Sequence, residues 1–373
     1  MNIKKYPCVY MRGGTSKAVI FHKKDLPEDK KEWKDIFLKV MGTPDVKQID
    51  GMGGTVSSTS KIAVISPSQE EGIDVYYDFY QVDIVIPRVD DSGNCGNISS
   101  TVGPFAVDEG LVKAVEPVTK VRVLNTNTNK IIEEYVKVKD GKAEIYGIDK
   151  IPGVPGTGAG IDMYFESPGG SVTGTTFPTG NKKDLIKISN NKSIETTIID
   201  CANPFVFVKA GDIGLKGTEL LELNSNKEKM NLIEEIRGKA AVKLGFVDLW
   251  EKAQTQSTSI PKVSIISKPQ NYIDLDKNKI KKEEMDLCVR AISVGSVHKA
   301  YPVTCYVATG AAAKIKGTLV QEISEINDKN NIVKIGHASG IGKIETIIED
   351  EKVKKVGVVR TARRIMDGNI YIK

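Results

Sequence analysis

Short runs rich in β-branched residues recur along the whole chain, and they constrain the fold more than any other feature of the sequence. Several of them alternate apolar and polar residues, as half-buried strands do. Helical patterns are fewer and do not alternate one for one with these runs, so the sequence predicts an α+β fold rather than a doubly wound parallel sheet. The expected strands are Cys8–Met11, Ala18–Phe21, Ile62–Ser66, Val75–Gln81, Val121–Leu124, Ile194–Ile199, Phe205–Lys209, Val263–Ile266, Lys343–Ile348 and Val356–Arg360. The expected helices are Glu32–Met41, Ser99–Glu109, Lys216–Lys227, Met230–Leu244, Lys282–Ala291 and Ala308–Lys314.

A stretch dense in glycine, proline, serine and threonine, residues 151–180, divides the chain near its middle. Such composition is typical of loops, and 373 residues are enough for two domains of roughly 150 residues each. We therefore expect one domain over residues 1–184 and another over 185–373, with the final strand free to return to the first. Each half opens on a strand that leads to a polar loop and later has a loop entering a small-residue helix. This echo indicates an internal duplication with one cleft between the copies.

Bulk composition excludes several classes of function. The net charge of +5 is dispersed among interspersed lysines and glutamates, which suits small anions and argues against a nucleic-acid interface. No apolar run approaches the ~20 residues that span a bilayer, and no signal-peptide pattern precedes the first strand. Five cysteines without a C-x-x-C pair fit a reducing cytoplasm, and three widely separated histidines disfavour a zinc site.

The segment 90–100 carries a cysteine in a setting that favours reactivity. Cys95 stands among small and amide residues, which make a poor hydrophobic core, just before a helix-like run. Backbone N–H groups at the start of a helix stabilise a thiolate and also hold a carboxylate. We interpret Cys95 as a reactive thiol in a substrate-binding loop, the alternative being a buried and inert cysteine. Its neighbours are Gly93, Asn94, Gly96 and Asn97.

A glycine-rich and then hydroxyl-rich loop, residues 51–60, ends at Lys61 and leads into a strand-like run. It lacks the spacing of a phosphate-binding P-loop, which a helix would follow. A lysine desolvated in a pocket has a lowered pKa and can act as a base near neutral pH. Lys61 is therefore a candidate base, the alternative being an ordinary surface lysine.

Further polar loops offer candidate binding groups. In residues 12–16, Arg-Gly-Gly-Thr-Ser, the glycines allow close backbone approach to a ligand and the arginine can bind a carboxylate through two N–H groups. A hairpin turn with an exposed arginine is the alternative. Residues 298–304 and 335–340 also place polar groups beside small residues, either as ligand contacts or as surface loops.

Several separated stretches resemble one family, the PrpF-like or methylitaconate Δ-isomerase family. They are Met-Arg-Gly-Gly-Thr-Ser-Lys at 11–17, Thr-Ser-Lys at 59–61, Gly-Asn-Cys-Gly-Asn at 93–97, Ala-Tyr-Pro-Val-Thr at 300–304 and Gly-His-Ala-Ser-Gly at 336–340. The resemblance runs from about residue 6 to about residue 370. It implies a diaminopimelate epimerase-like fold, with two pseudo-symmetric domains and the active site in the interdomain cleft.

The resemblance also implies an activity. Members of the family shift a carbon–carbon double bond in small unsaturated di- or tricarboxylates, without a cofactor or metal. The expected reaction is allylic proton transfer of the methylitaconate to dimethylmaleate type. Alternatives are an aconitate isomerase, an oxalomesaconate tautomerase, or an accessory protein to a methylcitrate dehydratase. Both a monomer and a homodimer are compatible with the chain.

The residues expected to carry this activity follow from the matching motifs and loops. The catalytic lysine and cysteine of the family fall on Lys61 and Cys95, and Asn203, before Pro204, resembles a substrate-binding asparagine of the epimerases. The residues expected to bind substrate are Arg12, Thr15, Ser16, Ser60, Asn94, Gly96, Asn97, Asn203, His298, Thr304 and Ser339.

One departure separates this chain from the epimerases. Those enzymes use two cysteines, one in each half, to move a proton between opposite faces of a carbon. Val307 stands where the second cysteine would be, and Cys305 lies two residues earlier. Amino-acid epimerisation by two thiols is therefore disfavoured, and a lysine–cysteine pair is the better hypothesis.

Overall fold

The computed structural model describes residues 3–189, 191–326 and 331–373. The chain forms two compact units, one of Met1–Tyr164 with Val359–Lys373 and the other of Phe165–Val358. The division thus falls earlier than the expected boundary between residues 184 and 185. The end of the glycine-rich segment hydrogen-bonds to a strand of the second unit, with Gly170 N–H donating to Asp200 O at 2.9 Å, while its first part belongs to the first unit.

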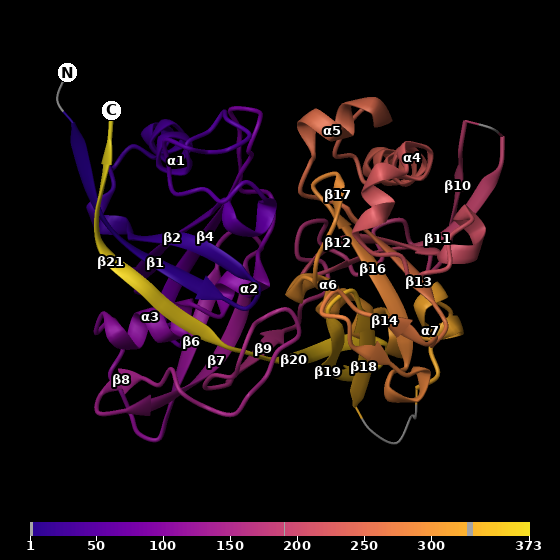
Figure 1. The fold of residues 1–373 in the computed structure, drawn as a ribbon. Coiled ribbons are helices and arrows are strands. Elements are labelled where there is room, and N and C mark those ends of the chain that lie inside the picture. The colour runs from indigo at the N-terminus through magenta and orange to yellow at the C-terminus, as the bar shows by residue number, and fades with distance from the viewer. Residues whose placement is uncertain (1–2, 190, 327–330) are drawn as a thin grey trace. The chain divides into compact units, whose positions relative to one another are not determined.

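The first unit is built on a mixed sheet with the strand order β21-β1-β2-β3-β4-β6-β7. Neighbours are antiparallel except β2–β3 and β4–β6, which are parallel. In Figure 1 the yellow β21 runs beside the indigo β1, so the end of the chain returns to this unit. Its strands are β1 (Lys4–Gly13), β2 (Ser16–His22), β3 (Lys61–Pro67), β4 (Val75–Val82), β5 (Val89–Asp90), β6 (Val118–Asn125), β7 (Lys130–Lys139), β8 (Lys142–Ala143), β21 (Ala362–Ile372) and most of β9 (Ile161–Glu166). Its helices are α1 (Trp33–Met41), α2 (Gly96–Ser99) and α3 (Val102–Asp108).

Helices cover both faces of this sheet. On one face Phe37 of α1 packs against Phe21 and Tyr80, with ring centroids 6.1 and 4.9 Å apart. Successive strand residues point to opposite faces, so His22 faces the other way, where its ring lies 4.8 Å from Phe105 of α3. The face opposite α1 is therefore the one on which the segment containing Cys95 begins α2 and α3.

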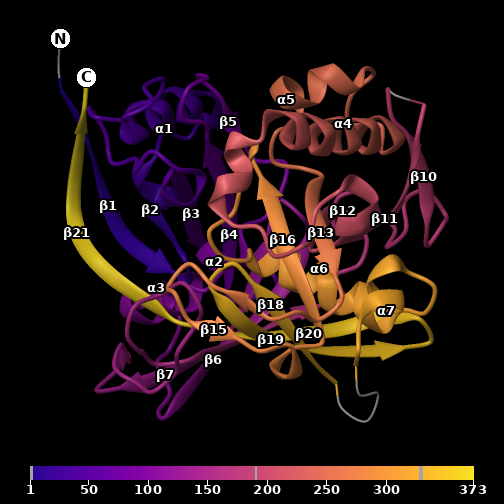
Figure 2. The same cartoon turned by 45° about the vertical axis from the view of Figure 1, so that its right-hand side comes forward.

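The second unit has a sheet of order β10-β11-β12-β13-β16-β18-β19-β20, with β12–β13 and β16–β18 parallel and the other neighbours antiparallel. Figures 1 and 2 show α4 on one side of these strands and α6 on the other. The strands are β10 (Asp184–Lys187), β11 (Ser193–Cys201), β12 (Asn203–Lys209), β13 (Lys262–Ser267), β14 (Tyr272–Ile273), β15 (Lys279–Ile280), β16 (Leu287–Ser293), β17 (Ser296–Val297), β18 (Ile332–His337), β19 (Gly340–Glu349) and β20 (Lys352–Arg360). The helices are α4 (Lys227–Lys243), α5 (Ala253–Gln256), α6 (Val303–Lys314) and α7 (Leu319–Ile323).

The two sheets repeat one topology, in agreement with the expected duplication. One series of neighbouring strands is β1-β2-β3-β4-β6-β7 and the other is β11-β12-β13-β16-β18-β19. In both series the successive pairs are antiparallel, parallel, antiparallel, parallel and antiparallel. A helix follows the second strand of each series, α1 or α4, and a helix pair follows the fourth, α2–α3 or α6–α7. The segment of Cys95 and the segment before α6 are therefore topological counterparts.

Each expected strand lies within an observed strand, but two expected helices are wrong. Residues 216–226 contain the 3₁₀ turn Leu221–Ser225 and no α-helix, since α4 begins at Lys227, and residues 282–291 form a 3₁₀ turn followed by β16. All seven residues of β16 are buried, so the apolar run has no alternation, and such a run does not distinguish a strand from a helix. Among the described residues, no helix combines the length and apolarity that crossing a membrane requires.

Glu134 of β7 is a fully buried carboxyl group beneath α3. Its Oε2 accepts a hydrogen bond from Gly103 N–H at 2.9 Å, while its Oε1 has no hydrogen-bond partner among the described residues. Burial raises its pKa from 4.5 to about 8. The folded chain therefore holds a proton on Glu134 that the unfolded chain releases above pH 4.5.

Replacing Glu134 with Gln should reduce the dependence of stability on pH. Between pH 4.5 and about 8 the unfolded wild-type chain binds fewer protons at this group, so the free energy of unfolding falls as pH rises. A single group changes the folding equilibrium by up to about tenfold per pH unit in this window. Urea denaturation at several pH values should show a flatter curve for E134Q. The exposed Glu144→Gln control should keep the wild-type slope, and an unchanged slope in E134Q would contradict the assignment.

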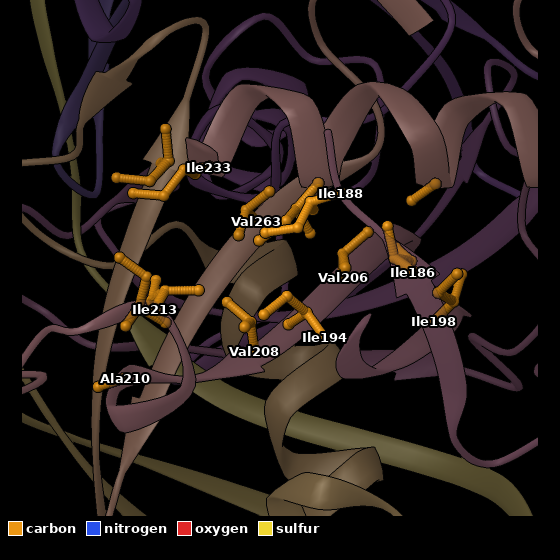
Figure 3. Close-up of a cluster of buried hydrophobic side chains, with 14 of the residues drawn as sticks. Ile186, Ile188, Ile194, Ile198, Val206, Val208, Ala210, Ile213, Ile233 and Val263 are labelled. Atoms are coloured by element: carbon orange, nitrogen blue, oxygen red, sulfur yellow. The ribbon is translucent and has the colours of Figure 1, made fainter. Parts of the chain in front are cut away.

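An aliphatic cluster joins β11, β12 and β13 to α4 in the second unit (Figure 3). Ile198, Val206 and Val263 from the strands pack with Ile233 and Ile236 from the helix, and each is at most 1% exposed. Alternate residues of the strands supply the cluster, so α4 covers one face of the sheet continuously. This packing supports β12, whose first residue is Asn203.

Truncating Ile198 to alanine should lower the free energy of unfolding by about 2–5 kcal/mol, because it leaves a cavity in a fully buried cluster. The matched control is Ile273→Ala, since Ile273 is 55% exposed and exposed changes usually fall within about 0.5 kcal/mol. Urea denaturation midpoints measure both. Equal losses in the two variants would show that this cluster does not limit stability.

Candidate active site

The pairing of β3 with β4 places Lys61 directly opposite Gln81. Their neighbours Ile62 and Tyr80 belong to the apolar cluster that packs against α1. Because side chains alternate across a strand, Lys61 and Gln81 point to the other face. Tyr77 lies on that face too, and its hydroxyl donates to the carbonyl oxygen of Cys95 at 3.4 Å. The strand register thus directs Lys61 toward the face that carries the Cys95 loop.

The amine of Lys61 is almost completely removed from solvent. The residue is 7% exposed, its Nζ donates to Oε1 of Gln81, and Nζ lies 5.2 Å from the ring centroid of Phe79. Burial lowers its pKa, and the charge of Cys95 opposes that shift. Lys61 and Cys95 are therefore within electrostatic range of each other.

Cys95 precedes the first residue of α2 and is partly exposed, whereas the other four cysteines are buried. Its carbonyl oxygen accepts from the backbone N–H of Ser99 at 2.9 Å. The Ser99 hydroxyl also approaches that oxygen at 3.2 Å and Asn94 Oδ1 at 3.3 Å. Asn94 and Gly96 on either side are buried. These contacts fix the backbone of the loop around the partly exposed Cys95.

The turn at residues 12–16 contacts the cysteine segment through Asn97. Nδ2 of Asn97 donates to Thr15 Oγ1 at 3.0 Å. A Cβ added at Gly13 would lie 2.3 Å from Asn97 O, and one added at Gly14 would lie 2.1 Å from Asn97 Oδ1. Gly14 also has a φ of +49°. Both glycines are therefore required for the close approach of the turn to α2.

Arg12 is already engaged within its own unit. Nη1 donates to Gly14 O at 3.1 Å and to Thr361 O at 2.8 Å. Burial, with a contribution from Arg363, lowers the pKa of its guanidinium. Arg12 stabilises the turn that holds Thr15 and the buried Ser16, and its binding of a substrate carboxylate stays a prediction.

The glycine-rich loop before Lys61 encloses the buried side chain of Gln48. Nε2 of Gln48 donates to Ser60 Oγ at 2.7 Å, and its Oε1 accepts from Thr55 N–H at 3.0 Å. A Cβ at Gly53 would lie 2.2 Å from Gln48 Cδ. The loop thus anchors Ser60, the residue before Lys61, to the protein.

The second unit carries the remaining expected residues on the ends of its elements. Asn203 begins β12 and is fully buried, after Ala202 with its φ of +61°. Thr304 is buried in the first turn of α6. The Ser339 hydroxyl donates to Lys299 O. The loops near residues 300 and 339 therefore contact each other.

His298 lies in the same group of loops. Its Nδ1 accepts from Ala300 N–H at 3.1 Å, and this contact fixes the ring at the entry to the Tyr301–Pro302 turn. The expectation that these four residues and those of the first unit line one cleft stays a prediction. Within the first unit, Lys61, Cys95, Thr15 and Asn97 are brought onto one face.

Several residues around Lys61 were not predicted from the sequence. They are Gln48, Tyr77, Phe79, Gln81 and Ser99. The signal for three of them was present, because the strand-like runs 62–66 and 75–81 could have been paired as a hairpin. Within the described ranges, no group of three or more His, Cys, Asp or Glu side chains could hold a metal ion.

Comparisons with known proteins identify the family of the chain. The PrpF protein family matches residues 3–373. The chain is 43% identical to the 3-methylitaconate isomerase of Eubacterium barkeri over 371 residues, covering 99% of this chain and 97% of that protein. It is 38% identical to the 2-methyl-aconitate isomerase of Cupriavidus necator, covering 99% and 97%. It is 34% identical to the (4E)-oxalomesaconate Delta-isomerase of Novosphingobium sp. strain KA1, covering 100% and 98%.

Solved structures give the same result for the fold. A crystal structure of methylitaconate-delta-isomerase superposes with a TM-score of 0.83 at 42% identity, covering 100% of this chain and 96% of that one. A hydroxyproline epimerase from Agrobacterium vitis shares the fold alone, with a TM-score of 0.58 at 11% identity and coverage of 98% and 92%. The expected diaminopimelate epimerase-like α+β fold is confirmed, and the chain belongs to the PrpF family.

Proposed function

We propose that the chain is a cofactor-independent isomerase that shifts the C=C bond of a small unsaturated dicarboxylate, of the methylitaconate to dimethylmaleate type. The observation that carries this proposal is the enclosed amine of Lys61 within electrostatic range of the partly exposed Cys95. Relatives named as isomerases of methylitaconate, methylaconitate and oxalomesaconate support the class of substrate. The reducing cytoplasm fits the five free cysteines, and small anions fit the dispersed positive charge.

The chemistry requires two proton transfers. One member of the Lys61–Cys95 pair removes a proton from the carbon between a carboxylate and the alkene, and the electron pair enters a dienolate. The other member returns a proton at the γ carbon, which completes the shift of the double bond, and a proton exchange between the two groups resets them. A base whose pKa lies near the working pH is the most effective, and burial lowers the Lys61 pKa toward that range.

The dienolate needs donors for its negative charge, and removing one such donor in other enzymes costs about 3 kcal/mol. We propose that the first unit supplies Arg12, Thr15, Ser16, Ser60 and the segment Asn94–Asn97. The second unit would supply Asn203, His298, Thr304 and Ser339. These residues carry N–H or O–H donors suited to carboxylates.

Incubation with a panel of unsaturated acids in deuterated water, followed by proton NMR, tests the function. Methylitaconate should be converted to dimethylmaleate with deuterium incorporated at the γ carbon. Conversion of aconitate or oxalomesaconate alone would assign the alternative isomerases. No exchange with any acid, together with binding to a methylcitrate dehydratase, would instead support an accessory role.

Replacing Lys61 with alanine should lower the rates of both isomerisation and proton exchange by about 10²- to 10⁴-fold, the usual contribution of a general acid or base. The exposed Lys113→Ala variant is the matched control and should retain the wild-type rates. Deuterium exchange monitored by NMR measures each. Near-native exchange in K61A would remove the lysine from the mechanism.

A further inference from the structure

We infer that Gln81 is a positioning residue that holds the Lys61 amine at one point on the sheet and directs its remaining bonding positions away from β4. The inference deepens the proposed function, since it gives the catalytic amine a fixed partner. It rests on the strand register, which places the two residues opposite each other. It also rests on the hydrogen bonds of the Gln81 amide.

The amide of Gln81 has only one orientation compatible with its surroundings. Its Nε2 lies 2.9 Å from Ser60 O, 3.2 Å from Ser57 O and 3.3 Å from Val82 O. All three are carbonyl acceptors, so the NH₂ group must face them. Oε1 is left facing Nζ of Lys61. The residue is 8% exposed, so water does not offer an alternative partner easily.

A carbonyl oxygen at this position can accept a hydrogen bond from Lys61 in both of its protonation states. The ammonium form can donate one of its three N–H groups to Oε1, and the neutral amine can donate one of two. In the neutral amine the lone pair then cannot point at Oε1, because two acceptors would repel each other. The ring of Phe79 occupies a further side of Nζ. The lone pair is thereby directed to the remaining space, where a substrate proton could be taken.

The neutrality of Gln81 matters as much as its position. A carboxylate opposite Lys61 would favour the ammonium form and oppose the effect of burial, whereas an amide leaves the pKa lowered. A thiolate at Cys95, in the loop before α2, would oppose the effect of burial on Lys61. Tyr77 on β4 lies at that loop, but its pKa is raised well above 10 and it stays neutral. Gln81 therefore positions the amine without fixing its charge.

Two substitutions that act in opposite directions test the inference. In Gln81→Glu the carboxylate should raise the Lys61 pKa by about 1–3 pH units. In Gln81→Met, which has a similar shape and no acceptor of comparable strength, the pKa should fall below that of the wild type. The measurement is an NMR titration with ¹³Cε-labelled lysine, in which the Lys61 signal is the one missing from K61A. The exposed Gln69→Glu variant, which adds the same charge elsewhere, should leave the titration unchanged.

Kinetics supply the second readout. In both Gln81 variants kcat should fall while KM holds, and the limb of the pH–rate profile that follows Lys61 should move with its NMR pKa. A role in folding alone would change both variants in the same way. Unchanged Lys61 titration in both, or shifts of the same sign, would overturn the inference. If one variant does not fold, the sign of the shift in the other decides.

The titration needs no substrate, so the two proposals fail separately. Opposite pKa shifts in a protein that isomerises none of the acids would refute the proposed function and retain the pairing of Gln81 with Lys61. Isomerase activity with a titration insensitive to Gln81 would do the reverse.

Discussion

The desolvation of one amine is the constraint around which the first unit is organised. Lys61 sits at the first residue of β3 and is almost fully enclosed, and a buried ammonium is costly unless its environment compensates for lost water. The compensation comes from a neutral amide, an aromatic face and a nearby thiol rather than from a carboxylate partner. A carboxylate would have produced a stable ion pair and a lysine of little use as a base. The glycine-rich loop surrounds Gln48, whose hydrogen bond to Ser60 fixes the start of β3.

The two units share one topology, but they differ in the exposure of the cysteine that lies near the lysine at the start of a strand. Lys262 is the first residue of β13, as Lys61 is the first residue of β3. The charge of Lys262 contributes a lowering of the Cys305 pKa, so this lysine and cysteine interact as Lys61 and Cys95 do. Cys305, however, is fully buried within α6, and burial raises its pKa strongly. Val307 is buried as well. The second half thus keeps the scaffold, while its thiol lacks the exposure that reactivity requires.

The sequence was sufficient for the fold class and for ten of the strands, because period-2 alternation is visible in one dimension. The pair Lys61 and Cys95 follows from the resemblance to the PrpF-like family, and its catalytic role stays a prediction. The sequence was insufficient where partners come from elsewhere in the chain. Gln81 lies at the end of an unremarkable strand, and only the register with β3 gives it a role. Arg12 and Ser60 illustrate the same limit, since their predicted ligand-binding groups already bind the protein itself. The boundary between the two units falls within the glycine-rich segment, where long-range hydrogen bonds such as Gly170 N–H to Asp200 O are not visible in the composition.

Three buried ionisable groups on the face opposite α1 are shifted toward their neutral forms. Burial lowers the pKa of Lys61, raises that of Glu134 to about 8 and raises that of Tyr77 well above 10. Each shift favours the uncharged form of its group in the region beneath the Cys95 loop. Under the proposed function, an incoming dicarboxylate would meet these groups together with N–H and O–H donors. In such a setting a proton can move between carbon and a side chain without breaking a strong ion pair, and preorganised donors act at low dielectric.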